Sequence, residues 1–197
     1  AETGHIVTCK TEHEAVLQTC EILEQKGFLV TYLPVDYNGC ISLSELDQAI
    51  NPQTLIVSLM AANNEVGTLH PLSEIGAICR KHGVLFHCDA TQAIGKIGLD
   101  VKQCNIDLLS FSGHKIYAPK GVGALYTRSG KPRVRLKPQT FGGGQERGLR
   151  SGTLNVPGIV GFGSACSLAA DLLESESVKL TDLRIRLWNR IKLAIPK

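Results

Sequence analysis

Apolar residues follow two alternating patterns along most of this chain. The first pattern is a short, nearly continuous apolar run of the length of one β-strand, bounded by turn residues. Such runs cover residues 4–9, 28–33, 54–60, 84–88, 107–111 and 123–126. The second pattern, found between several of these runs, repeats apolar residues at every third or fourth position, as on one face of a helix. The alternation predicts an α/β fold, in which helices flank a mostly parallel sheet.

The predicted helices carry local signals at their ends. They run from just after residue 13 to Gly27, from Ser42 to Pro52, over residues 72–82, and over residues 157–173 and 178–195. Ser42 and Glu45 have the spacing of a capping box, in which each side chain accepts a backbone N–H of the first turn or its flank. Gly27 and Gly83 stand where glycine commonly ends a helix.

Polar residues directly follow three of the predicted strands. These residues are Asn63 and Asn64, Asp89, and the segment 112–115, which reads Ser-Gly-His-Lys. The carboxyl ends of parallel strands meet at one edge of a sheet, and ligands bind outside that edge. We therefore expect these polar side chains to lie on one rim.

Lys115 is the residue of this rim with the most distinctive chemistry. A lysine that is partly withdrawn from water can lose its proton and add to a carbonyl group as a Schiff base. Ser112 and His114 beside it offer hydroxyl and imidazole donors that suit a phosphate group. A solvated loop lysine is the ordinary alternative, because a short motif alone carries little information.

Other residues near the rim complete the set of groups that pyridoxal phosphate requires. Asp89 can keep the pyridine nitrogen protonated, since a carboxylate favours a neighbouring cation. Gln92 can donate to the ring oxygen, and His13 can stack on the face of the ring. Each residue also has a plain structural interpretation: Asp89 as a cap, His13 as the first residue of a helix, and Gln92 as a surface side chain.

Composition and charge exclude several other classes of protein. The chain has 197 residues and a net charge of +3, too mild to indicate nucleic-acid binding. Its basic cluster at residues 131–137 is predicted to be the solvent face of an edge strand. No apolar run approaches the ~20 residues of a membrane span. Seven cysteines at irregular spacing indicate a reducing compartment, either cytoplasm or an organelle matrix.

Six sequence blocks together resemble the signature motifs of one enzyme family. They are residues 11–13 (Thr-Glu-His), 63–67 (Asn-Asn-Glu-Val-Gly), 87–92 (His-Cys-Asp-Ala-Thr-Gln), 112–115 (Ser-Gly-His-Lys), 142–148 (Gly-Gly-Gly-Gln-Glu-Arg-Gly) and 150–153 (Arg-Ser-Gly-Thr). The blocks resemble those of the cysteine desulfurases, which belong to the class V aminotransferases among the fold type I pyridoxal phosphate enzymes. The sequence at residues 145–148, Gln-Glu-Arg-Gly, resembles that of the family branch that contains the NifS and IscS proteins.

The resemblance implies a role for each candidate residue. It implies Lys115 as the Schiff-base lysine, Asp89 at the pyridine nitrogen, Gln92 at the ring hydroxyl, and His13 on the ring face with a possible acid or base function. It further implies phosphate binding by Ser112 and His114, contact of Asn64 with the substrate carboxylate and a cofactor oxygen, and a reach of Thr153 to the phosphate of the other subunit in a homodimer.

The resemblance also implies an activity and partners. The family converts L-cysteine to L-alanine and passes the sulfur, as a persulfide, to iron–sulfur scaffold proteins or other acceptors. Its nucleophilic cysteine lies in a smaller carboxyl-terminal domain. We therefore expect residues 1–197 to be part of the large cofactor-binding domain, without an amino-terminal phosphate loop and without that small domain. Cys166 lies in a helical pattern and is predicted to be a packing residue.

Three alternatives remain open from the sequence. The first is a selenocysteine lyase or another class V enzyme. The second is an incompetent fragment that serves only as a structural or oligomerisation module. The third is a metal site at residues 82, 87, 88 and 89; however, the adjacent His87 and Cys88 of a strand point to opposite faces of the sheet and so cannot easily share one ion.

Overall fold

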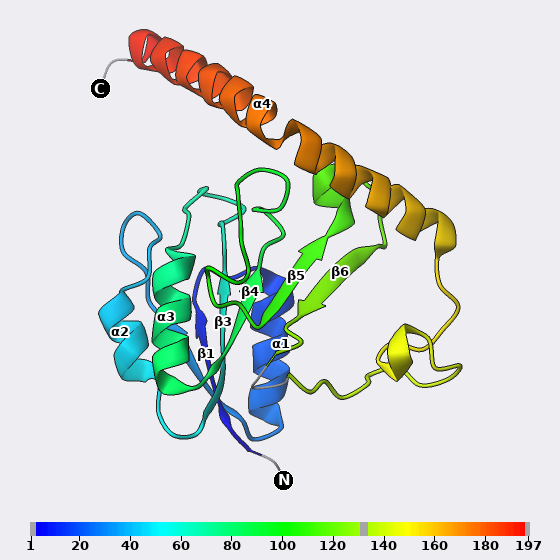
Figure 1. Cartoon of the computed structure of the whole chain (residues 1–197). Coiled ribbons are helices and arrows are strands. Elements are labelled where there is room, and N and C mark those ends of the chain that lie inside the picture. Colours follow the sequence, from blue (N-terminus) through cyan, green and yellow to red (C-terminus); the bar gives the residue numbers. More distant parts are fainter. Residues whose placement is uncertain (1–2, 131–133, 196–197) are drawn as a thin grey trace.

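The computed structural model describes residues 3–130 and 134–195 and is built around one six-stranded sheet (Figure 1). The strands are β1 (His5–Cys9), β2 (Leu29–Leu33), β3 (Thr54–Met60), β4 (Leu85–Asp89), β5 (Leu108–Ser112) and β6 (Gly123–Thr127). Their order across the sheet is β2-β1-β3-β4-β5-β6. The first five strands are parallel, and β6 pairs with β5 in antiparallel register. The predicted mostly parallel α/β fold is confirmed.

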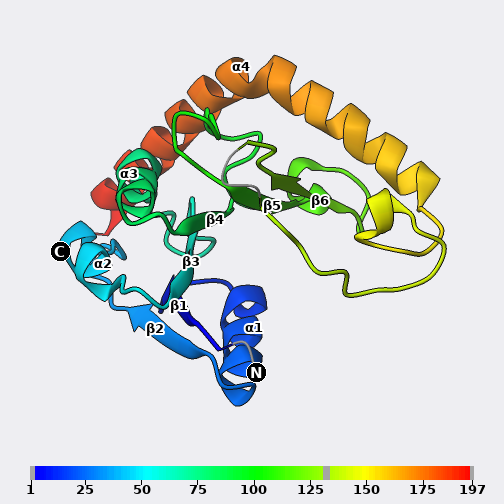
Figure 2. The same ribbon diagram turned by 60° about the horizontal axis from the view of Figure 1, so that its bottom comes forward.

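Three helices connect the first four strands in sequence and lie on both faces of the sheet (Figure 2). They are α1 (Glu14–Gln25), α2 (Leu43–Ala49) and α3 (Leu72–His82). In Figure 2, α1 lies on one side of the sheet, and α2 and α3 lie on the other. Ser42 Oγ accepts the backbone N–H of Glu45 at the start of α2, as the capping pattern predicts. Gly83 ends α3 in the left-handed conformation that favours glycine, with φ of 69°.

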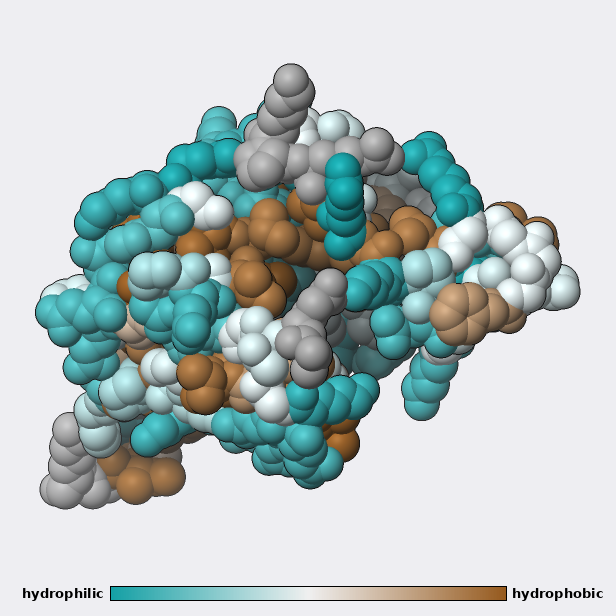
Figure 3. Space-filling view, turned by 90° about the horizontal axis from the view of Figure 1, so that it is seen from below, coloured by the Kyte–Doolittle hydropathy of each residue, from teal (hydrophilic) through white to brown (hydrophobic). Residues whose placement is uncertain are grey.

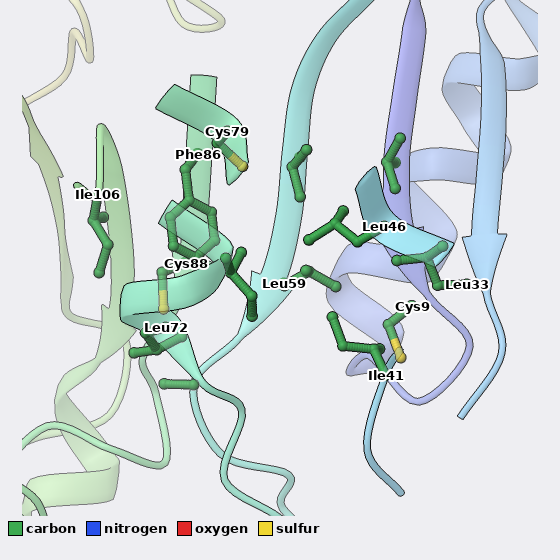
Figure 4. Packing of buried hydrophobic residues seen from close by; sticks show 14 of the residues in the cluster. Cys9, Leu33, Ile41, Leu46, Leu59, Leu72, Cys79, Phe86, Cys88 and Ile106 are labelled. Carbon is green, nitrogen blue, oxygen red and sulfur yellow. The ribbon is translucent and has the colours of Figure 1, made fainter. Parts of the chain in front are cut away.

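The two faces of the sheet differ in chemistry because successive side chains of a strand alternate between them. On the face covered by α2 and α3, Val57 of β3 pairs with Phe86 of β4, and Leu59 pairs with Cys88. All four side chains are fully buried in the main apolar core, which Figure 4 shows from close by. Burial of one such large side chain contributes roughly 1.5–3 kcal/mol to stability. The core therefore occupies one face, and the other face is left for a site.

The carboxyl-terminal part of the described chain is one helix, α4 (Val156–Ala194), of 39 residues. The sequence predicts two helices, over 157–173 and 178–195, with a break at the polar residues Glu174 to Ser177, and this expectation is wrong. The break does not form because neither glycine nor proline lies there, and exposed glutamate and serine fit a helix at little cost. The amino-terminal half of α4 packs on the sheet domain, where the rings of Phe162 and Phe111 have centroids 5.3 Å apart.

Exposed apolar side chains line much of α4. Leu168, Leu187 and Trp188 are more than half exposed, at 60%, 61% and 55%. By length and composition alone, α4 is also able to cross a membrane, since an 18-residue window has a mean hydropathy of 1.5 and 17% of that window is buried. A helix that packs on a water-exposed domain can pass the same test, so the expected absence of membrane contact stays a prediction.

The basic cluster at residues 131–137 does not form the predicted edge strand where it can be judged. Residues 131–133 lie outside the described part of the chain, and Val134 to Lys137 have no regular secondary structure. They begin a loop that leads away from β6 towards the glycine-rich segment before α4 (Figure 1).

On the face drawn in Figure 3 the surface is hollowed near its middle, and apolar side chains border the hollow.

Candidate active site

A cavity of about 770 Å³ opens where the carboxyl ends of β3, β4 and β5 meet the start of α1. Seven of the eight predicted site residues line it, and they are His13, Asn64, Asp89, Gln92, Ser112, His114 and Lys115. Its floor comes from the sheet face opposite the apolar core, including Ile56 and Ser58 of β3. The predicted common rim of strand ends is therefore present, and α1 forms one wall through residues such as Val16 and Cys20.

Lys115 is placed by a tight turn at the end of β5. The strand ends at Ser112, and a single 3₁₀ turn, η1 (Gly113–Ile116), follows. A Cβ atom at Gly113 would come within 2.9 Å of the Phe162 ring and 3.0 Å of the Val122 carbonyl oxygen, so only glycine fits at this packed position. The Gly113 N–H also donates to Val122 O at 2.9 Å. This anchored glycine holds the following Lys115 at the cavity, where its side chain is exposed.

Ser112 and His114 form a pair beside Lys115. Ser112 Oγ and His114 Nδ1 are 2.7 Å apart, and both residues line the cavity. The hydrogen bond orients the imidazole ring, so that its Nε2 edge stays available to a ligand. Two neutral or cationic donors next to an amine suit a phosphate or another anion.

Asp89 is the last residue of β4 and serves two purposes. Its Oδ1 accepts the backbone N–H of Thr91 at 2.9 Å, which is the capping interaction expected of an aspartate at this position. Asp89 also lines the cavity, as does Lys115. The structural interpretation and the functional one are therefore compatible, because one carboxylate has oxygens for both.

His13 caps α1 and faces the same cavity. Its Nδ1 accepts the backbone N–H of Ala15 at 3.1 Å, in the role of an N-cap residue. A nitrogen that accepts a hydrogen bond carries no proton, so neutral His13 has its proton on Nε2. The cap thus selects one tautomer and fixes the ring at the cavity wall.

The two adjacent asparagines have different surroundings. Asn63 is buried, and its side chain ties the loop together by donating to Thr11 O at 2.9 Å and by accepting the N–H groups of Glu65 and Val66 at 2.9 Å. Asn64 is exposed and lines the cavity. Asn63 therefore shapes the loop that presents Asn64.

Thr153 is the one predicted site residue that does not line the cavity. It lies in the glycine-rich loop before α4, which is held by internal bonds: Gly152 N–H donates to Gln145 Oε1 at 2.9 Å, and Gly144 N–H donates to Ser151 Oγ at 3.3 Å. A role at the cavity of a second subunit does not require Thr153 to face this one. That role stays a prediction.

The metal alternative has no geometric support. His82 lies at the surface with Nε2 2.7 Å from Asp47, His87 faces the cavity floor, and Cys88 is buried in the apolar core. Within residues 3–130 and 134–195, no three histidine, cysteine or acidic side chains gather as a metal site would require. His87 and Asp89 share the cavity face of β4, but Cys88 points into the core on the other face and His82 binds Asp47 at the surface, so the four side chains do not surround one point.

Sequence reasoning missed a row of polar side chains on the cavity floor. His87 Nδ1 is 2.8 Å from Ser58 Oγ, and His87 Nε2 is 3.0 Å from Ser110 Oγ, so the row crosses β3, β4 and β5. Burial lowers the pKa of His87, which favours the neutral ring, although the charge of Asp89 opposes this shift. Part of a signal was present within single strands, because His87 and Ser110 stand two positions before Asp89 and Ser112 and so point to the same face as those residues.

Glu12 was also missed, although it adjoins His13. Only 5% of its surface is exposed, Oε1 accepts the Met60 N–H at 2.7 Å, and Oε2 has no hydrogen-bond partner among the described residues. Burial, with a smaller contribution from the charge of Asp89, raises the pKa of Glu12 to about 8. Glu12 therefore carries a proton at neutral pH and ties the His13 loop to the end of β3.

The donor set of the cavity fits pyridoxal phosphate. An aldehyde requires an amine, a pyridine nitrogen requires an acid, and a phosphate requires donors. Lys115, Asp89, and the pair of Ser112 and His114 supply these groups within one cavity. The cavity volume of about 770 Å³ exceeds what a single small ring needs and leaves room for a substrate.

The chain is similar to several known proteins over most of its length. The chain is 53% identical, over 193 residues, to a protein named cysteine desulfurase IscS from Ehrlichia chaffeensis, covering 98% of this chain and 47% of that relative. It is 46% identical to a solved NifS-like protein, with a TM-score of 0.90 over 95% of this chain and 51% of the other. The solved structure of SspA in complex with cysteine is 46% identical, with a TM-score of 0.80 over 85% of this chain and 48% of the other.

The chain spans about half the length of the relatives it matches. A model of the family described as aminotransferase class-V matches residues 1–191, nearly the whole chain, and the chain therefore belongs to the class-V aminotransferases.

Proposed function

We propose that the protein containing this chain is a pyridoxal phosphate-dependent cysteine desulfurase, which converts L-cysteine to L-alanine and passes the sulfur on as a persulfide. The observation that carries the proposal is the presence of Lys115 and Asp89 at one cavity, together with donors for a phosphate. The similarity to proteins named cysteine desulfurase, and to a protein solved in complex with cysteine, supports L-cysteine as the substrate.

The residues of this chain have distinct tasks in that reaction. When bound, pyridoxal phosphate supplies an electron sink for the charge that develops at the substrate α-carbon. Lys115 would supply the amine that holds the aldehyde of the cofactor. Asp89 would keep the ring nitrogen protonated. His13, whose Nδ1 is occupied by the N-cap hydrogen bond of α1, would stack on the ring and offer a proton on Nε2.

The remaining residues bind and orient. All four of the following residues line the cavity. In this proposal Ser112 and His114 would bind the phosphate, and Gln92 and Asn64 would bind oxygens of the ring and of the substrate carboxylate. Thr153, in the loop before α4, would serve the phosphate site of the second subunit in a homodimer. Precise placement of this kind contributes a large part of catalysis in cofactor enzymes.

The sulfur-accepting cysteine is proposed to lie outside this chain, in a carboxyl-terminal domain, with this chain forming part of the large cofactor-binding domain. Cys166 is a poor candidate, because partial burial in α4 raises the pKa of its thiol and so disfavours the nucleophilic thiolate. It also does not line the cavity. The persulfide would be delivered to an iron–sulfur scaffold or another acceptor protein in the cytoplasm or an organelle matrix.

The proposal is tested by titrating the purified chain with pyridoxal phosphate and recording its visible absorption. We expect a new band from the covalent adduct at Lys115, and borohydride reduction followed by peptide mass spectrometry should place the added mass on that residue. Lys115→Ala should abolish the band, and Lys120→Ala, which removes an exposed lysine nearby, should retain it.

Two results would overturn this assignment. One is the absence of a band in the parent chain at saturating pyridoxal phosphate. The other is a band of the same intensity in Lys115→Ala, because it would place the adduct on a different amine. In the full-length protein, formation of alanine from L-cysteine should depend on Lys115 in the same way.

A further inference from the structure

The side chain of Gln92 is hydrogen-bonded by a second lysine, Lys96. Lys96 Nζ donates to Gln92 Oε1 at a distance of 2.8 Å, and Gln92 itself lines the cavity. An ammonium group has donors and no acceptor, so it can bind only the oxygen end of a carboxamide. The bond therefore determines which end of Gln92 is occupied and leaves the NH₂ end free to donate.

Close packing keeps Lys96 near Lys115. Gly95, directly before Lys96, has φ of +73°, and a Cβ atom there would lie 3.0 Å from both Ile116 Cγ2 and Ala169 Cβ. The turn thus packs against the residue that follows Lys115 and against α4. The pKa of Lys96 is lowered by partial burial and, to a smaller extent, by the positive charge of Lys115.

We infer that Lys96 is a positioning residue, which turns the NH₂ group of Gln92 toward the cofactor oxygen next to the aldehyde and adds positive charge on the side of Lys115. The inference rests on the proposed function, since it assigns Gln92 to that oxygen. An oxygen that is an anion, as in a phenolate, requires donors, and a reversed carboxamide would present an acceptor to it. Lys96 prevents that reversal.

Loss of Lys96 has two measurable consequences. Without this hydrogen bond the carboxamide of Gln92 rotates freely. Only some of its orientations then present the NH₂ group to the ring oxygen, so the affinity for pyridoxal phosphate falls. A nearby cation disfavours the charged form of a cationic group, so without the charge of Lys96 the cationic adduct at Lys115 would keep its proton to higher pH. The pH midpoint of the visible band therefore rises.

The test compares Lys96→Met, Lys96→Ala and Lys96→Arg with the parent chain, and uses Lys102→Met as a matched control at an exposed turn. Both neutral variants should raise the pyridoxal phosphate concentration of half-saturation about fivefold, which corresponds to one modest hydrogen bond. They should raise the pH midpoint by about half a unit, as expected for loss of one partly screened charge. Lys96→Arg and Lys102→Met should stay near the parent values.

A double-mutant cycle with Gln92→Ala separates positioning from a general effect on folding. If Lys96 acts through Gln92, Lys96→Met should weaken binding much less in the Gln92→Ala background than in the parent chain. A merely structural role would change the unfolding temperature and leave the pH midpoint unmoved, so circular dichroism melts accompany each variant.

The possible failures are distinct. If the parent chain gives a band but the neutral variants match it in half-saturation and midpoint, the inference about Lys96 is wrong and the proposed function stands. The same holds if the effect of Lys96→Met is undiminished in Gln92→Ala. If the parent chain gives no band, the proposed function fails and the inference fails with it.

Discussion

The carboxyl group of Glu12 lies in the loop between β1 and α1, where burial changes its chemistry. One oxygen accepts the Met60 N–H, the other has no partner among the described residues, and the pKa is raised to about 8. A protonated carboxyl avoids adding a second negative charge beside Asp89. At the scale of single residues, the surroundings therefore decide whether a glutamate is an acid or a structural hydrogen-bonding group.

Glu12→Gln should make the protein more stable at neutral and alkaline pH. The folded pKa of Glu12 lies above its ordinary value of 4.5, so the favourable protonated state is fully present below pH 4.5 and is lost progressively as the pH rises to about 8. Glutamine has nearly the same shape as protonated glutamate and does not ionise, so the variant does not lose this stability as the pH rises. At pH 7 the difference is at most about 3 kcal/mol.

The measurement is the unfolding temperature of both proteins from pH 5 to pH 9. The gap between Glu12→Gln and the parent chain should widen up to about pH 8 and then remain constant, whereas the exposed Glu21→Gln should follow the parent chain. A gap that does not change with pH would show that Glu12 is not the group responsible.

Glycines inside two helices show how elements are packed against one another. A Cβ atom at Gly76 of α3 would lie 1.9 Å from the carbonyl oxygen of Cys104, too close for any contact, so the helix touches the backbone of the 100–105 turn. Gly163 of α4 has nothing within 4 Å of the same position. Glycine is therefore required for packing at position 76 in α3 but not at position 163 in α4.

Substitution of these glycines by alanine should have opposite effects. Gly76→Ala must displace α3 or the 100–105 turn, and overpacking of this kind costs roughly 1–3 kcal/mol or more. Gly163→Ala should stabilise α4 by about 0.5–1 kcal/mol, because alanine favours a helix more than glycine does. Urea denaturation of the two variants provides the check, and a Gly76→Ala protein as stable as the parent would contradict the packing.

The molecule as a whole separates a core face of the sheet from a site face. Apolar side chains of β1, β3, β4 and β5 meet α2 and α3 on the core face, and residues of alternate parity from the same strands line the cavity with α1. The cavity is lined by segments that are far apart in sequence, from His13 to Lys115, and a ligand in it would contact several of them. Its binding should therefore stabilise the entire fold rather than one element.

Pyridoxal phosphate should raise the unfolding temperature of the chain in a concentration-dependent manner. At a hundredfold excess over the dissociation constant, linkage adds about 2.7 kcal/mol. For a chain of this size that amounts to roughly 5–10 °C. Pyridoxal, which lacks the phosphate, should have a smaller effect at equal concentration because it loses the donors of Ser112 and His114. An unfolding temperature independent of pyridoxal phosphate would contradict binding in this cavity.

Much of this architecture could be predicted because the signals are local. The alternating apolar runs placed all six strands within about two residues, and the Ser42 cap and the glycine stops located helix ends. Seven of the predicted site residues line one cavity, because residues that follow parallel strands must meet at one rim. The break predicted within α4 was wrong, since polarity at 174–177 indicated a loop although those residues also suit an exposed helix.

The amino-acid sequence by itself determined the strands, most helices and the chemical groups available at the rim, because these depend on neighbours a few positions apart. Only the tertiary structure decided the strand order, the burial that keeps Glu12 protonated, the row joining Ser58, His87 and Ser110, and the grip of Lys96 on Gln92. Desolvation and contacts depend on what the rest of the chain brings alongside a residue. The local pattern of apolar and polar residues does not show which distant residues these will be.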